Sequence, residues 1–140
     1  MKLFGPPAQL AGLCVADDRT KPVFVVDDDA SVRDSLSVLL ETRGFRVFTH
    51  GSGAQLLADD RRRNAGCLIV DQHMPGMDGL EMLSALHREG IRAPAILITG
   101  RLDPTLSERA ASIGVKEILE KPFPATRLIG LVRSSLEEGG

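Results

Sequence analysis

The sequence predicts a doubly wound α/β fold, in which helices cover both faces of a five-stranded parallel β-sheet. Short apolar runs of strand length, such as Val23–Val26 and Cys67–Val70, alternate with longer stretches whose apolar residues recur at helical spacing. Runs that are apolar throughout are typical of parallel strands buried on both faces. Five strands joined by right-handed helical crossovers give a sandwich of this kind.

The expected elements alternate five times along the chain. The predicted strands are Val23–Val26, Phe45–Phe48, Cys67–Val70, Ala95–Ile98 and Val115–Glu120. The helical stretches are expected to begin near Ala30, Gly53, Gly79, Asp103 and Phe123. The second strand alternates apolar and polar residues, which places it nearer an edge. In the flavodoxin-like (βα)5 class the strand order is 2-1-3-4-5, and ligands bind between strands 1 and 3.

Local signals support the helix assignments. Val32, Leu36, Leu39 and Leu40 fall on one face of the first helix. Gly44 is expected to end that helix. Asp29 is a candidate N-cap, and Asp103-Pro104 reads as an N-cap followed by proline in the first helical position.

Length and composition indicate a single globular domain. The chain has 140 residues, of which 43% are hydrophobic and 26% charged, and its net charge of −2 gives no general attraction to nucleic acid or anionic membrane. Residues 1–21 differ in character and are expected to form a flexible N-terminal extension to a domain over residues 22–140. No apolar run reaches membrane-spanning length and the N-terminus is a poor signal peptide, so we expect a cytoplasmic location.

Two further groups of residues have unremarkable expected roles. Cys14 and Cys67 form neither a disulfide framework nor a metal-binding spacing, and Cys67 is expected to be a small core residue. The Arg61–Arg63 run is expected to lie on a solvated face, with a docking or nucleic-acid patch as the sharper alternative.

Polar residues follow four of the predicted strands. Asp27-Asp28-Asp29, Asp71, Thr99 and Lys121 each stand where a strand ends. Because ligands of such sheets bind outside the carboxyl ends of the strands, these side chains are expected at one edge. Clustered carboxylates repel one another unless a cation neutralises them, and a hard, oxygen-preferring ion such as Mg2+ suits them. The set is typical of phosphoryl chemistry.

Four separated motifs carry a resemblance to a known family. The stretches VFVVDDDASVRDSL, LIVDQHMPGMDGLEML, ILITG and EKPF resemble the receiver domain of two-component response regulators, over roughly residues 22–137. Their details are similar to regulators of the nitrogen-fixation type. The resemblance implies that the aspartate ending strand 3, Asp71, accepts a phosphoryl group from a phosphohistidine of a partner kinase with Mg2+ bound.

The resemblance also implies roles for the surrounding residues. Asp28, Asp71 and the backbone carbonyl of His73 would bind Mg2+, and Asp27 would act through water. Thr99 and Lys121 would contact the phosphoryl oxygens, and Lys121-Pro122 would be a cis peptide. Thr99 would also act as a switch residue.

One position departs from the family pattern. Receiver domains usually carry Tyr or Phe three residues before the strand-5 lysine, where this chain has Ile118. A branched aliphatic cannot exchange an exposed polar ring for a buried one. The two positions of the usual switch pair are held here by Thr99 and Ile118. The resemblance therefore leaves open how the signal leaves the site.

The implied function is that of a phosphoacceptor and not of a multiple-turnover enzyme. Partners would be a sensor histidine kinase or phosphotransfer protein, and a downstream effector or output domain met through helix 4, strand 5 and helix 5. A phosphorylation-dependent dimer is a further candidate, and no direct nucleic-acid or membrane contact is expected. Two alternatives remain: a Mg2+-dependent phosphohydrolase with Asp71 as nucleophile, and an interaction module that works without phosphorylation. Such hydrolases usually need a second aspartate where this chain has His73.

Overall fold

The computed structural model describes residues 21–139, so nearly all of the expected N-terminal extension, residues 1–21, lies outside the described part of the chain. The strands are β3 (Val23–Val26), β4 (Val47–His50), β5 (Cys67–Asp71), β6 (Ala95–Thr99) and β7 (Glu117–Glu120). The helices are α1 (Ala30–Thr42), α2 (Gly53–Leu57), the 3₁₀ helix η1 (Asp60–Asn64), α3 (Gly79–Arg88), α4 (Pro104–Ile113) and α5 (Ala125–Gly139).

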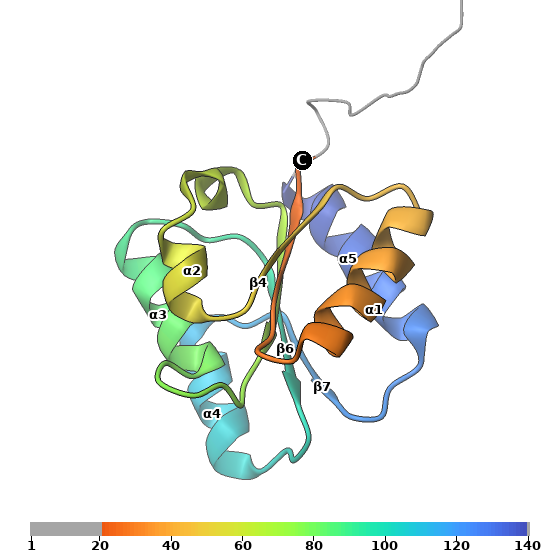
Figure 1. The fold of residues 1–140 in the computed structure, drawn as a ribbon. Coiled ribbons are helices and arrows are strands. Elements are labelled where there is room, and N and C mark those ends of the chain that lie inside the picture. The colour runs from red at the N-terminus through yellow and green to blue at the C-terminus, as the bar shows by residue number, and fades with distance from the viewer. Residues whose placement is uncertain (1–20, 140) are drawn as a thin grey trace, which may run out of the picture.

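The strands form one parallel sheet in the order β4-β3-β5-β6-β7. Numbered along the chain, this is the predicted order 2-1-3-4-5, and the doubly wound flavodoxin-like fold is confirmed. Helices α1 and α5 cover one face of the sheet, while α2, α3 and α4 cover the other (Figure 1). Two apolar clusters, one on each face, bury the central strands β3, β5 and β6.

Two strands start later than the sequence predicted, for the same physical reason. Strand β4 begins at Val47 instead of Phe45, because the Phe45 N–H still donates to the Leu40 carbonyl of α1. Strand β7 likewise begins at Glu117 instead of Val115, whose N–H donates to a carbonyl near the end of α4. In both places the backbone closes the preceding helix before it can join the sheet.

The predicted helix signals are found in place. The Asp29 side chain accepts hydrogen bonds from the backbone N–H groups at the start of α1, and Asp103 does so for α4, where Pro104 is the first helical residue. Gly44 follows the end of α1 with φ +90°, a conformation that glycine adopts without strain. Leu36 and Leu40 are the residues that α1 buries.

The arginine run is only partly solvated, which corrects the prediction for its middle member. Arg61 and Arg63 are exposed, but Arg62 is only 6% exposed. Its guanidinium donates from Nε and Nη2 to the two carboxylate oxygens of Glu89, each at 3.0 Å. The 3₁₀ turn of η1 points this side chain inward, where the bidentate pair with Glu89 satisfies its charge.

The prediction for Cys67 is confirmed, because its side chain is fully buried in the core. That burial raises the pKa of the Cys67 thiol to about 11. Within residues 21–139, none of the helices combines the length and the apolar character that crossing a bilayer would require.

Candidate functional site

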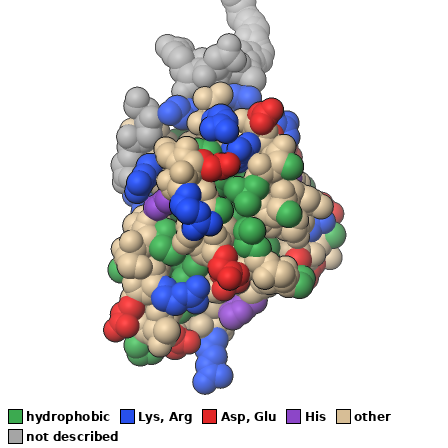
Figure 2. Space-filling model, turned by 90° about the vertical axis from the view of Figure 1, so that its left-hand side faces the viewer, with side chains coloured by type: hydrophobic (Ala, Val, Ile, Leu, Met, Phe, Trp, Pro, Cys, Tyr) green, Lys and Arg blue, Asp and Glu red, His purple; other side chains and the backbone are tan. Residues whose placement is uncertain are grey.

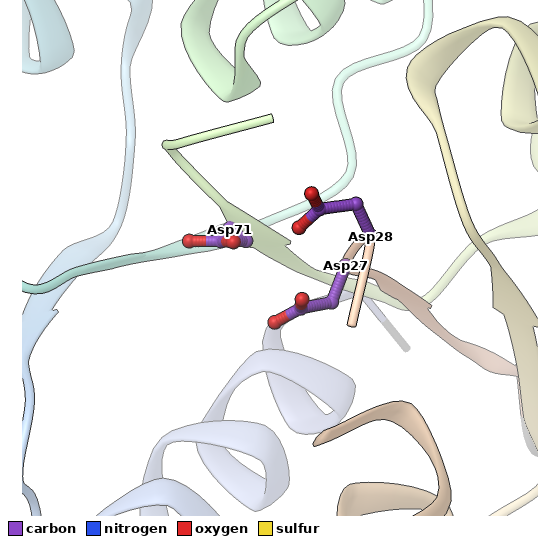
Figure 3. Close-up of side chains that lie close together, drawn as sticks. All are labelled: Asp27, Asp28 and Asp71. Carbon is purple, nitrogen blue, oxygen red and sulfur yellow. The ribbon is translucent and has the colours of Figure 1, made fainter. Parts of the chain in front are cut away.

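Three aspartates meet where strands β3 and β5 end. Asp27 and Asp28 directly follow β3, Asp71 is the last residue of β5, and these two strands are neighbours in register. One carboxylate oxygen from each residue lies within 4.8 Å of the other two. Figure 3 shows the three side chains extending toward the same region. The structure therefore brings together the carboxylates that the sequence predicted at this edge.

Burial and mutual repulsion set the electrostatics of the cluster. Asp27 and Asp71 are 2% and 6% exposed, whereas Asp28 is exposed. Burial raises the pKa of Asp27, with the Asp71 carboxylate adding to the rise and a hydrogen bond from the Asp29 N–H opposing it. Burial also raises the pKa of Asp71, against the nearby Lys121 ammonium. Such a site gains from a bound cation, and its all-oxygen donors fit a hard divalent ion.

The backbone around Asp27 is fixed by several hydrogen bonds. Its N–H donates to the His50 carbonyl of β4 at 3.1 Å, and its Oδ1 accepts from the Asp29 N–H at 2.9 Å. Its carbonyl accepts from Arg33 Nη1 at 2.6 Å. The turn after β3 is thus held on the β4 side and on the α1 side.

Thr99 and Lys121 stand at the ends of the next two strands. Thr99 is the last residue of β6 and is fully buried, and its carbonyl accepts the Lys121 N–H at 2.9 Å just beyond β7. The Lys121 charge acts on both Asp27 and Asp71. The Lys121–Pro122 peptide is cis, as the family resemblance implied.

His73 has a contact that sequence reasoning missed. Its backbone N–H lies 3.4 Å from Asp71 Oδ1, and its ring Nε2 lies 3.1 Å from Thr99 Oγ1. The sequence predicted a metal-binding role for the His73 carbonyl but not this contact of its ring. The available signal was the adjacency of β5 and β6 in the predicted sheet, since His73 follows one strand and Thr99 ends the other.

The structure also defines the surroundings of Ile118 and Gln72. Ile118 is half-buried, pairs in register with Leu97 of β6 and packs against the core on the α3 side. Gln72 was not singled out from the sequence, yet it is buried and its Oε1 accepts the Leu80 N–H of α3 at 3.0 Å. Gln72 therefore ties the start of α3 to the end of β5.

A separate hollow of about 850 Å³ lies between α3 and α4, away from the acidic cluster. Its lining includes Met77, Glu81, Arg88 and Arg109, and it lacks the convergent carboxylates of the strand ends. The face built from α2, α3 and α4, shown in Figure 2, mixes basic, acidic and hydrophobic side chains. The acidic cluster, and not this hollow, is therefore the candidate site of chemistry.

Fold and site together define an open α/β domain with an acidic pocket, able to hold a metal ion, at the switch point of its sheet. The chain belongs to the response regulator receiver domain family, whose sequence profile matches residues 23–133. It is a signalling domain of two-component systems.

Relatives and solved structures agree with this assignment. The transcriptional regulatory protein FixJ of Azorhizobium caulinodans is 42% identical over 115 residues, which are 82% of this chain and 54% of that protein. The crystal structure of FixJ-N matches with a TM-score of 0.75 and 36% identity, covering 84% of this chain and 94% of the other. Vibrio cholerae chemotaxis protein CheY4 matches with a TM-score of 0.77 and 27% identity, covering 84% and 99%. The chain spans about half the length of the FixJ regulators, 54% and 57%.

Proposed function

We propose that this domain is a phosphorylation-controlled switch in which Asp71 accepts a phosphoryl group from a phosphohistidine of a sensor kinase or phosphotransfer protein. The observation that carries the proposal is the meeting of the Asp27, Asp28 and Asp71 carboxylates within 4.8 Å at the open end of the sheet. A kinase that draws its phosphoryl group from ATP would place the exchange in the cytoplasm.

The acidic pocket is the candidate Mg2+ site. Asp28 and Asp71 would hold the ion directly, together with the backbone carbonyl of His73, and Asp27 would act through water. Carboxylate and carbonyl oxygens are the donors that Mg2+ prefers. The bound ion would supply positive charge that lets an anionic phosphoryl donor approach a carboxylate.

The transfer step is a displacement at phosphorus. A carboxylate oxygen of Asp71 attacks the phosphorus, the N–P bond of the phosphohistidine breaks, and its electron pair stays on the imidazole nitrogen of the donor. The acyl phosphate adds about one negative charge to the pocket. The Lys121 ammonium and the Thr99 hydroxyl would donate to the phosphoryl oxygens. Water later attacks the phosphorus, releases inorganic phosphate and restores the carboxylate.

The Thr99 hydroxyl links this chemistry to a change of shape. It now interacts with the backbone N–H and carbonyl of Arg101, each at 3.1 Å. Turning toward a phosphoryl oxygen would release these bonds and let the loop before α4 move. A face made of α4, β7 and α5 would then change its preference for an output domain, an effector or a second copy of the domain.

A hydrolase function finds no comparable support. Its acid-base carboxylate would have to stand at position 73, where the imidazole of His73 instead contacts Thr99. Turnover of a phosphate ester by the purified protein would revive this alternative.

Acetyl phosphate with Mg2+, followed by intact-mass measurement, tests the proposal. We expect one phosphoryl group on the wild type and none on Asp71→Asn. Asp29→Asn is the matched control and should be labelled almost normally, because asparagine also caps a helix. Asp28→Ala should weaken Mg2+ binding by about 10-fold or more. Full labelling of Asp71→Asn, or unchanged Mg2+ affinity of Asp28→Ala, would contradict the respective assignment.

A further inference from the structure

We propose that Arg33 of α1 is a positioning residue, which holds the Asp27–Asp28 turn in the shape that binds the cation of the acidic pocket. The inference rests on the proposed function of that pocket. It assigns a role to a side chain that touches none of the three carboxylates through any hydrogen bond or ion pair found in residues 21–139.

The Asp27 carbonyl depends on this arginine for its hydrogen bond. The residue is nearly buried, and its carbonyl lies past the last paired residue of β3 and before the N-cap of α1. Neither the sheet ladder nor the helix therefore satisfies it. Within the described chain, Arg33 Nη1 is the donor that does so, at 2.6 Å. A buried carbonyl without a donor is costly, and a bond from a charged donor is stronger than a neutral one.

The guanidinium lies against the turn after β4. A Cβ on Gly51 would lie 3.1 Å from Arg33 Nη1 and 3.6 Å from its Cζ. The missing side chain at position 51 leaves the space that the guanidinium occupies. Arg33 thus spans from α1 to the backbone just past β3, with Gly51 on its other side.

The consequence for the pocket follows from the geometry of one peptide unit. The Asp27 carbonyl and the Asp28 N–H belong to the same rigid plane, so fixing the carbonyl fixes the direction in which Asp28 leaves the turn. The exposed Asp28 carboxylate accepts no hydrogen bond within residues 21–139, and its position therefore depends on this backbone. Arg33 acts through the turn, since within residues 21–139 its guanidinium donates to the Asp27 carbonyl and to none of the three carboxylates.

The test compares Arg33→Met, which keeps the aliphatic stem, with Arg33→Lys, which can still donate. Mg2+ titration followed by NMR should give a dissociation constant about 10-fold higher for Arg33→Met, the scale on which supporting residues change metal affinity. Arg33→Lys should recover most of this loss. At saturating Mg2+, labelling of Arg33→Met by acetyl phosphate should return to within about twofold of wild type, since the nucleophile itself is intact. Arg43→Met, an exposed arginine just after α1, is the matched control and should match wild type throughout.

A second set of measurements needs neither Mg2+ nor phosphorylation. In the metal-free protein, Arg33→Met should speed hydrogen exchange at the Asp29 amide, which donates to Asp27 Oδ1. Gly51→Ala should crowd the guanidinium and weaken Mg2+ binding by a smaller factor. Because both changes act on one contact, their combined effect should be less than the product of the two.

The outcomes separate the two proposals. If Arg33→Met lowers resistance to urea but leaves the Mg2+ dissociation constant and Asp29 exchange unchanged, Arg33 is merely structural and the inference is wrong. If the wild type is not labelled and does not bind Mg2+, the proposed function fails. In that case the cation-binding part of the inference fails with it. Faster Asp29 exchange in Arg33→Met would still show that Arg33 holds the turn, and unchanged exchange would overturn that as well.

Discussion

The ring Nε2 of His73 lies 3.1 Å from Thr99 Oγ1, although His73 follows β5 and Thr99 ends the neighbouring strand β6. The same hydroxyl interacts with the backbone of Arg101 at 3.1 Å. Before phosphorylation, therefore, the group expected to meet a phosphoryl oxygen is already engaged on two sides. We expect His73 and Arg101 to flank the route by which water would reach a phosphoryl group on Asp71.

The lifetime of the phosphorylated form should depend on Arg101. Its side chain is exposed next to Thr99 and would shield the phosphoryl group, so Arg101→Ala should speed phosphate loss severalfold. The measurement is the decay of the phosphorylated mass after removal of acetyl phosphate. Arg88→Ala, on the exposed surface of α3, is the control and should decay like wild type. A slower or unchanged decay of Arg101→Ala would count against shielding.

Gly79 should be intolerant of even one methyl group. A Cβ there would lie 2.8 Å from the Asp71 carbonyl, 2.9 Å from Leu97 Cδ1 and 3.0 Å from Val70 Cγ1. We expect Gly79→Ala to destabilise the domain by about 1–3 kcal/mol in urea unfolding, despite the better helix propensity of alanine. It should also slow labelling of Asp71. Gly130→Ala is the control: its Cβ would meet open space in α5, and it should stabilise by about 0.5–1 kcal/mol.

The change of shape that follows phosphorylation should reach the face of α4, β7 and α5 without rotation of the Ile118 side chain. The beryllofluoride complex should move residues 100–103 and the start of α4, while Ile118 keeps its half-buried position against the core. Ile118→Ala should cost about 1–2 kcal/mol, less than full burial would imply, and leave Asp71 labelling intact. Paired free and beryllofluoride structures check this. A still loop with Ile118 changing from exposed to buried would refute it.

Acid should weaken the domain partly through Asp59. Hydrogen bonds from Arg61, and a further one from His50, hold the pKa of Asp59 well below its usual range. A depressed carboxyl pKa adds stability that is present above the unfolded value of about 3.9 and is lost as the pH falls below it.

Asp59→Asn isolates this contribution, because asparagine can still cap η1. At pH 7 the variant should be about 1–2 kcal/mol less stable in urea unfolding. The difference between the two proteins should shrink progressively as the pH falls below about 4. A difference that stays constant from pH 7 to pH 2 would contradict this origin.

Much of the fold was predictable because its signals are local. The apolar runs of β3, β5 and β6, and the caps at Asp29 and Asp103, were read correctly from neighbouring residues. The starts of β4 and β7 were each placed two residues too early. There the helix-closing hydrogen bonds of the preceding turn, which leave no mark in hydrophobic periodicity, decided the boundary.

The sequence by itself determined the alternation of strands and helices, and with it the strand ends at which Asp27, Asp28, Asp71, Thr99 and Lys121 stand. Parallel order then places these residues at one edge, since all strands of such a sheet end on the same side. Only the tertiary structure decided the contacts between side chains distant in sequence: Arg62 turned inward to Glu89, and His73 set against Thr99. It also decided that Arg33 reaches back to the Asp27 carbonyl. Such contacts depend on which buried polar group lacks a partner once the chain is packed, and that need arises only in three dimensions.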